Sequence, residues 1–119
     1  MTVKELYNTI HGDYDRAISV MMMDDFIKRM LTKFVQSDSS NELFKAYENK
    51  DYQGVFSAAH SIKGVAGNLA LTSLFNKIVP IVEGTRNYNN PSINIDKDIE
   101  DYRNEYQLVI SQLKRFLNL

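Results

Sequence analysis

The chain of 119 residues has no cysteine, an almost balanced charge and no long apolar run. The absence of cysteine excludes disulfide scaffolds, thiolate metal sites and cysteine nucleophiles, and it fits a reducing compartment. The 14 basic and 15 acidic residues argue against a surface for nucleic acid or an anionic membrane. No apolar run approaches the ~20 residues of a membrane span. Charged residues also interrupt the apolar positions of the first segment, so we expect no signal peptide and a cytoplasmic protein.

The spacing of the apolar residues predicts an all-α fold. They recur every three or four positions, and no segment shows the two-residue alternation of a strand. The length and the 44% apolar content suit one domain over residues 1–119, which we expect to be a monomer. We expect an up-and-down antiparallel four-helix bundle with extra short N-terminal helices. The main helices should cover residues 24–37, 40–50 with 52–69 as its hairpin partner, 72–86 and 96–118.

Local signals refine the N-terminal part of this prediction. Residues 2–10 should form a short helix that Gly12 ends, and Asp13 should cap a second short helix through Val20. The three consecutive methionines at 21–23 would make a poor exposed surface. We therefore expect them to pack in or near the core.

Three further signals concern the ends and the continuity of the main helices. Ser39 and Glu42 have the spacing of a capping box, and Thr72 is a candidate cap for the helix that follows it. Pro80 lacks a backbone donor, so it should kink or divide the helix over residues 72–86. Residues 87–95 are polar and predict a loop.

The segment over residues 55–71 is the one part of the chain that suggests a function. At ~100° per residue, His60 falls roughly 140° from the middle of the helix's apolar arc and should be exposed. Gly64 and Gly67 follow one and two turns later on the same side, and Lys63 is close enough to reach the same ligand. An interior glycine costs a helix about 1 kcal/mol relative to alanine. These glycines therefore indicate space cleared for a partner. The predicted apolar arc comprises Val55, Ala58, Ala59, Ile62, Val65, Ala66 and Leu69.

The sequence A-H-S-I-K-G-V-A-G-N-L, residues 59–69, resembles the A-H-x-[LI]-K-G signature of histidine-containing phosphotransfer (HPt) domains. The resemblance is dense over residues 56–69 and looser over the whole chain. It implies that His60 takes a phosphoryl group on an imidazole nitrogen, from one receiver-domain aspartate to another, in multistep two-component signalling. It further implies that Lys63 helps to neutralise this group and that Gly64 keeps the surface flat for a docking receiver.

The chain shows no sequence for binding ATP, since it has neither a Walker-type loop nor G-x-G-x-x-G. We therefore expect a phosphotransfer protein without a kinase site of its own. Its partners should be response-regulator receiver domains or a histidine kinase. We expect no cofactor, and Mg²⁺ would belong to the aspartate site of the partner receiver. A helical pair of metal ligands is absent, because Gly64 stands four residues after His60.

Other residues of the predicted site have less specific signals. Phe56, one turn before His60, belongs either to a docking surface or to the edge of the core. Gln53 and Gly67 are further candidates for contact with a partner. Arg86 could reach the phosphate if its helix runs antiparallel to the helix of His60. The HPt family often has glycine where Ala70 stands, so the turn after this helix should differ in shape.

Two alternatives remain open at the level of sequence. The chain could be the phosphoacceptor module of a larger histidine kinase, including the chemotaxis type, whose F-x-A-A-H-S-I-K-G motif also resembles residues 56–64. The immediate donor would then be an ATP-binding domain. The chain could also be a helical adaptor without phosphoryl chemistry, with His60 an ordinary surface histidine. The second histidine, His11, is flanked by a turn and should be structural or solvated.

Overall fold

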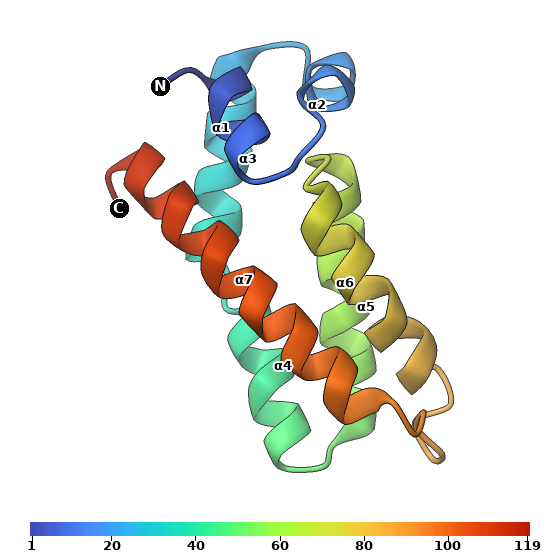
Figure 1. Cartoon of the computed structure of the whole chain (residues 1–119). Coiled ribbons are helices and arrows are strands. Elements are labelled where there is room, and N and C mark those ends of the chain that lie inside the picture. Colours follow the sequence, from blue (N-terminus) through green and yellow to red (C-terminus); the bar gives the residue numbers. More distant parts are fainter.

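The computed structural model describes residues 1–119 and contains seven helices and no strand, which confirms the all-α prediction. The helices form an elongated molecule of 43 × 25 × 19 Å (Figure 1). None of them is long and apolar enough to cross a membrane. In chain order they are α1 (Val3–Thr9), α2 (Tyr14–Met21), α3 (Asp24–Gln36), α4 (Ser39–Glu48), α5 (Tyr52–Asn68), α6 (Thr72–Thr85) and α7 (Ile95–Leu117).

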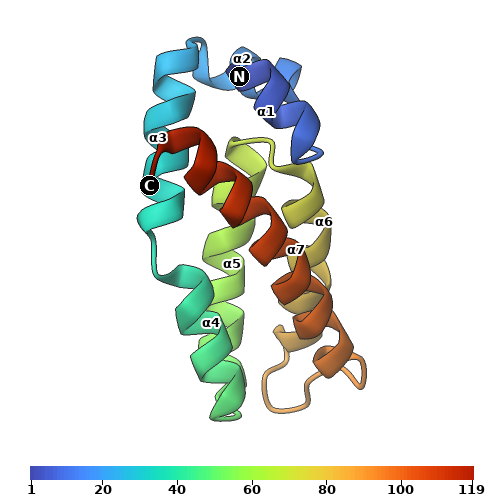
Figure 2. The same cartoon turned by 60° about the vertical axis from the view of Figure 1, so that its left-hand side comes forward.

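The four C-terminal helices pack in sequence, α4 against α5, α5 against α6 and α6 against α7 (Figure 2). Side chains also join α7 to α4. The Tyr47 hydroxyl donates a hydrogen bond to Asp96, and the hydroxyls of Ser40 and Tyr102 lie 2.8 Å apart. All 25 buried apolar side chains belong to one cluster, so the seven helices share a single core.

The short helices α1 and α2 cover one end of α5 (Figure 1). The buried Tyr7 hydroxyl donates to the carbonyl of Leu69 at 2.7 Å, and the Asp13 N–H donates to the carbonyl of Ala70 at 2.9 Å. The Asp13 carboxylate also accepts the N–H of Arg16, which confirms it as the cap of α2. The N-terminal segment therefore holds the chain where it leaves α5.

The turn after α5 depends on Ala70, which adopts a left-handed conformation with φ of 52°. The N–H of Leu71 donates to the carbonyl of Ala66, and the N–H of Ala70 donates to that of Gly67. This is the Schellman pattern, in which glycine is the residue without strain. Ala70 thus makes the turn that a glycine would favour, with a β-carbon added.

The methionine run does not pack as predicted. Met21 is partly buried, but Met22 is 79% exposed and Met23 is 59% exposed. Met22 ends α2 in the left-handed conformation, with φ of 72°, and Met23 precedes the first residue of α3. The turn between the two helices therefore directs both side chains outward, which the composition of the run did not indicate.

Two predicted caps are wrong, and Pro80 does not divide its helix as one form of the prediction expected. Ser39 is the first residue of α4 instead of its cap, and its N–H donates to the Ser37 hydroxyl at 3.2 Å. Thr72 likewise lies inside α6, and its hydroxyl donates back to the carbonyl of Ala70. Pro80 does not divide α6, which continues to Thr85 with Pro80 on its exposed side.

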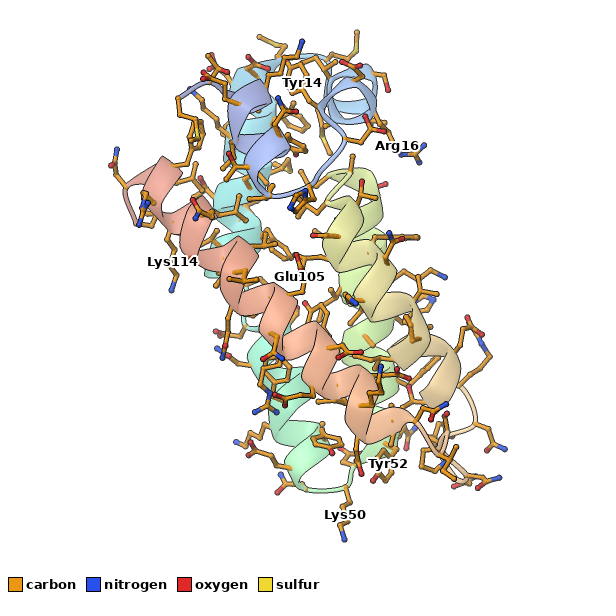
Figure 3. The ribbon with its side chains drawn as sticks, viewed as in Figure 1. Tyr14, Arg16, Lys50, Tyr52, Glu105 and Lys114 are labelled. Carbon is orange, nitrogen blue, oxygen red and sulfur yellow. The ribbon has the colours of Figure 1, made fainter.

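Most polar side chains of the chain are exposed or paired, and the buried Nε of Arg103 is the exception that has no hydrogen-bond partner. Figure 3 shows Lys50, at the turn between α4 and α5, and Lys114, near the end of α7, pointing away from the helices. Ser40 and Thr85 are the two buried polar residues. Ser40 is paired with a tyrosine of α7, and the Thr85 hydroxyl donates within α6 at 2.7 Å. Neither of these buried polar side chains belongs to α5.

Candidate functional site

Helix α5 places His60 on the exposed side near its middle, as the helical spacing predicts. The helix starts where the Asp51 carboxylate accepts the N–H of Gly54 at 3.0 Å. Its buried residues are spaced by three and four positions and face the core, which fixes the rotation of the helix about its axis. The buried set is Val55, Ala59, Ile62 and Ala66.

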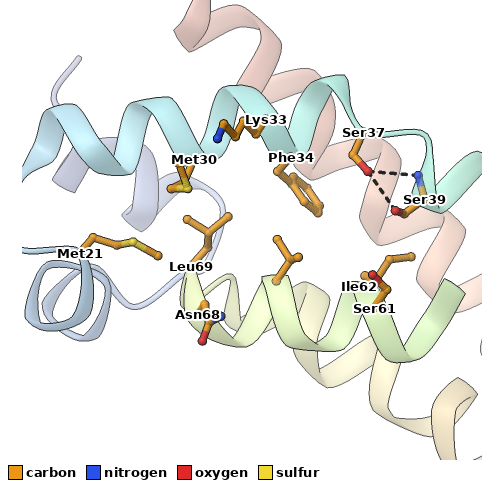
Figure 4. A pocket seen from close by; sticks show the side chains of 11 residues that line it. Met21, Met30, Lys33, Phe34, Ser37, Ser39, Ser61, Ile62, Asn68 and Leu69 are labelled. Carbon is orange, nitrogen blue, oxygen red and sulfur yellow. Dashed lines mark hydrogen bonds between the residues drawn. The ribbon is translucent and has the colours of Figure 1, made fainter. Parts of the chain in front are cut away.

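Val65 does not belong to the buried face, contrary to prediction. Its side chain is 41% exposed, while Ala58 is partly buried. Val65 lies beside a cavity of about 270 Å³ between α3 and α5 (Figure 4). The two helices therefore do not close over this position. Other apolar residues around the cavity are Met21, Met30, Phe34, Ile62 and Leu69.

The surroundings of His60 are open on the side of Gly64. A β-carbon built on Gly64 would have no neighbouring atom within 4 Å, so no contact inside the chain requires a glycine there. Lys63, one turn after His60, is partly buried at the edge of the same side. His60, Lys63 and the uncovered backbone of Gly64 thus follow one another within about one turn of α5.

Gly67 and Gln53 differ in their environment from Gly64. A β-carbon on Gly67 would lie 3.4 Å from the ring of Phe75, which is ordinary contact across the α5–α6 interface. Gly67 therefore borders α6 instead of open space. Gln53 is exposed in the first turn of α5. Contact of either residue with a partner stays a prediction.

The contacts between α5 and α6 bring Arg86 to the predicted site. Gly67, near the end of α5, lies close to Phe75, near the start of α6, so the helices run antiparallel. At their other ends the Arg86 guanidinium lies over the ring of Phe56, 5.6 Å from its centroid. The rings of Phe56 and His60 are 5.8 Å apart. Arg86 therefore lies beside the turn that precedes His60.

Glu83 completes this group of side chains, and the sequence analysis did not single it out. Arg86 donates to the Glu83 carboxylate through Nη2 at 2.9 Å and Nε at 3.3 Å. These hydrogen bonds, together with the positive charges of Arg86 and Lys63, hold the pKa of Glu83 below its usual value. The three-residue spacing of Glu83 and Arg86 on a helix is the signal that could have found the pair.

Phe56 lies at the edge of the core, as one of its two sequence interpretations predicts, and its contact with a partner stays a prediction. It is partly buried and packs against the core, and its ring also contacts His60 and Arg86. His11 lies in the turn after α1 with φ of 56°, well away in sequence from the residues around His60. No group of three or more histidine, aspartate or glutamate side chains is arranged to hold a metal ion.

Comparison with known proteins adds no relative to this description. No protein-family model, no curated protein and no solved structure matches the chain. The functional argument therefore rests on the residues of α5 and α6 and on their geometry.

Proposed function

We propose that the chain is a phosphocarrier of the HPt type. His60 accepts a phosphoryl group from the aspartate of a receiver domain and passes it reversibly to another receiver. The observation that carries the proposal is the exposed His60 in the middle of α5, with Lys63 one turn on and open space over Gly64. In this proposal α4, α5, α6 and α7 act as an up-and-down four-helix bundle that presents one face of α5.

The chemistry asks for a nucleophile in line with the phosphorus atom and for cations near the phosphoryl oxygens. A neutral imidazole supplies the nucleophile through the nitrogen that carries no proton. The N–P bond forms as the aspartyl O–P bond breaks, and the aspartate leaves as a carboxylate with the bonding electron pair. Lys63 offers a compact cation for the transferred group. Mg²⁺ belongs to the receiver, so the carrier supplies half of an active site.

The open space over Gly64 supports docking of a folded partner at His60. In-line transfer brings two backbones close together, and a side chain one turn after the histidine would stand between them. The glycine weakens the helix and satisfies no packing need within the chain. Clearance for a partner gives this residue a reason to be there.

Transfer from a phosphorylated receiver domain, followed by intact-protein mass spectrometry, tests the proposal. The wild type should gain one acid-labile phosphoryl group, and His60→Gln should gain none. His11→Asn is the matched control, since asparagine tolerates the left-handed backbone of this position, and it should accept the group like the wild type. Phosphorylated His60→Gln would contradict the proposal.

Two further outcomes separate the alternatives. If receivers fail but the ATP-binding domain of a histidine kinase phosphorylates His60, the chain is a kinase phosphoacceptor module. If both donors fail on folded protein, phosphoryl chemistry is excluded and a helical adaptor remains.

A further inference from the structure

Arg86 is a second cation beside His60, and it already has an anionic partner. Its guanidinium lies over Phe56, whose ring is next to that of His60. Two of its nitrogen atoms donate to the Glu83 carboxylate. Arg86 and Glu83 are both more than half exposed, so neither is fixed by burial. The pair is therefore held by its own charges and by the ring beneath the arginine.

No salt bridge joins Glu83 to Lys63, the lysine of the site. The positive charge of Lys63 on α5 contributes to the lowered pKa of the Glu83 carboxyl, which sits on α6. Glu83 therefore pairs directly with Arg86 and interacts with Lys63 only through the longer-range effect of its charge. Arg86, Lys63 and Glu83 together carry two positive charges and one negative charge, so the unmodified site keeps a net positive charge that suits an incoming phosphoryl group.

We propose that Glu83 is a positioning residue that holds Arg86 against Phe56, and that Arg86 exchanges Glu83 for the phosphoryl oxygens once His60 is phosphorylated. The inference rests on the proposed function of His60. The competition between Glu83 and the phosphoryl group for Arg86 then regulates the site, because it sets how long the group stays on the histidine.

The physical argument for the exchange is a comparison of two anions. An exposed ion pair three residues apart on a helix contributes little to stability, so it is easily given up. A phosphoryl group carries up to about two negative charges and three strong acceptor oxygens, where Glu83 has one charge and two oxygens. The planar fork of arginine suits bidentate contact with either anion. With the phosphoryl group one helical turn from Phe56, Arg86 has the stronger acceptor within reach of its flexible chain.

Loss of the phosphoryl group from chemically phosphorylated protein tests the proposal without any partner. Phosphoramidate modifies histidine directly, and a His11→Asn background leaves His60 as the single acceptor. Followed by ³¹P NMR, Glu83→Gln should lose the group about two- to five-fold more slowly than the parent, because Arg86 is released from competition. Arg86→Ala should lose it faster, and Glu83→Gln added to Arg86→Ala should change the rate no further.

Asp101→Asn is the matched control for these variants. It removes the other surface ion pair of the chain, Lys97 with Asp101 at 3.1 Å on α7, and should leave the rate unchanged. Equal rates for Glu83→Gln and the parent would overturn the inference. So would an effect of Glu83→Gln that persists in full without Arg86, because Glu83 would then act on His60 directly.

A spectroscopic readout follows the exchange itself. The Nε–H resonance of Arg86 should shift when His60 is phosphorylated, and in Glu83→Gln it should lie away from its wild-type position before phosphorylation. An Arg86 resonance that ignores phosphorylation would overturn the exchange.

The outcomes distinguish a failure of the exchange from a failure of the proposed carrier function. If phosphoramidate modifies His60 but no receiver does, the carrier function fails and the rates still judge the exchange. If receivers modify His60 and Glu83→Gln has no effect, the carrier function stands and the exchange fails. If neither phosphoramidate nor a receiver phosphorylates His60, both the carrier function and the exchange are overturned.

Discussion

Gly64 is the residue whose replacement separates folding from docking. Gly64→Ala should raise the free energy of unfolding by about 0.5–1 kcal/mol, because alanine is the better helix former and its β-carbon meets nothing within 4 Å. Gly64→Gln should keep most of this stability but slow phosphoryl transfer from a receiver by about tenfold or more, because its side chain stands between the two proteins. Urea denaturation and single-turnover transfer measure the two effects.

Gly12 provides the contrasting control for this prediction. A β-carbon there would lie 2.7 Å from the ring of Tyr7 and 3.0 Å from the carbonyl of Ala70, so Gly12→Ala should destabilise the fold by about 1–3 kcal/mol. If Gly64→Gln accepts the phosphoryl group as fast as the wild type, Gly64 does not clear space for a partner.

At the scale of single residues, the sequence predicts the features that depend on one helix alone. The exposure of His60 and the position of Gly64 follow from the rotation of α5, which its apolar residues define. Whether Arg86 lies near His60 could not be predicted, because the distance between them depends on how α6 crosses α5. Glu83 matters to the site only because its partner Arg86 lies over Phe56, which belongs to another helix. Val65 was misplaced for a similar reason, since its exposure depends on the gap between α3 and α5.

At the scale of the elements, α6 carries a removable defect. Pro80 lies inside the helix, where it cannot donate to the carbonyl four residues earlier, and its side chain is exposed. Pro80→Ala should therefore raise the free energy of unfolding by about 1–3 kcal/mol. Lys77→Ala, at another exposed position of α6, should change it by less than about 0.5 kcal/mol. Urea denaturation compares the two, and an unchanged or lower stability of Pro80→Ala would show that α6 depends on its proline.

The elements themselves were largely predictable, because amphipathic spacing is a property of each segment. The helices over residues 52–69, 72–86 and 96–118 agree with α5, α6 and α7 to within one residue at each end. The errors lie at helix ends, where single hydrogen bonds decide. Ser39 pairs with Ser37 instead of capping α4, and the turn at Met22 exposes a methionine that composition assigned to the core.

At the scale of the whole molecule, the connections between distant segments were not predictable from spacing. Tyr7 reaches the end of α5, and Tyr102 pairs with Ser40 across the interface of α7 and α4. The sequence indicates that such tyrosines are amphipathic, with an apolar ring and a hydroxyl that needs a partner when buried. It does not indicate which partner, because the residues are 62 positions apart in both pairs.

These tyrosines make the stability of the molecule sensitive to alkaline pH. Burial raises the pKa of Tyr7 and of Tyr102, and the hydrogen bond to Asp96 is the main cause that raises the pKa of Tyr47 to about 12. The folded chain thus keeps these protons to higher pH than the unfolded chain, in which tyrosine titrates near pH ~10. Their contribution is complete below pH ~10 and is lost as pH rises from there toward the folded values.

We therefore expect the free energy of unfolding to fall between about pH 10 and pH 12, with tyrosine ionisation delayed until unfolding. Urea denaturation at a series of pH values, with absorbance of the phenolate, measures both. Tyr47→Phe should reduce the slope, because it removes a proton that the folded chain holds more tightly. Tyr88→Phe, in the loop before α7, should leave the slope as it is. If the decrease in the free energy of unfolding with pH is the same in Tyr47→Phe, the hydrogen bond between Tyr47 and Asp96 does not contribute to alkaline stability.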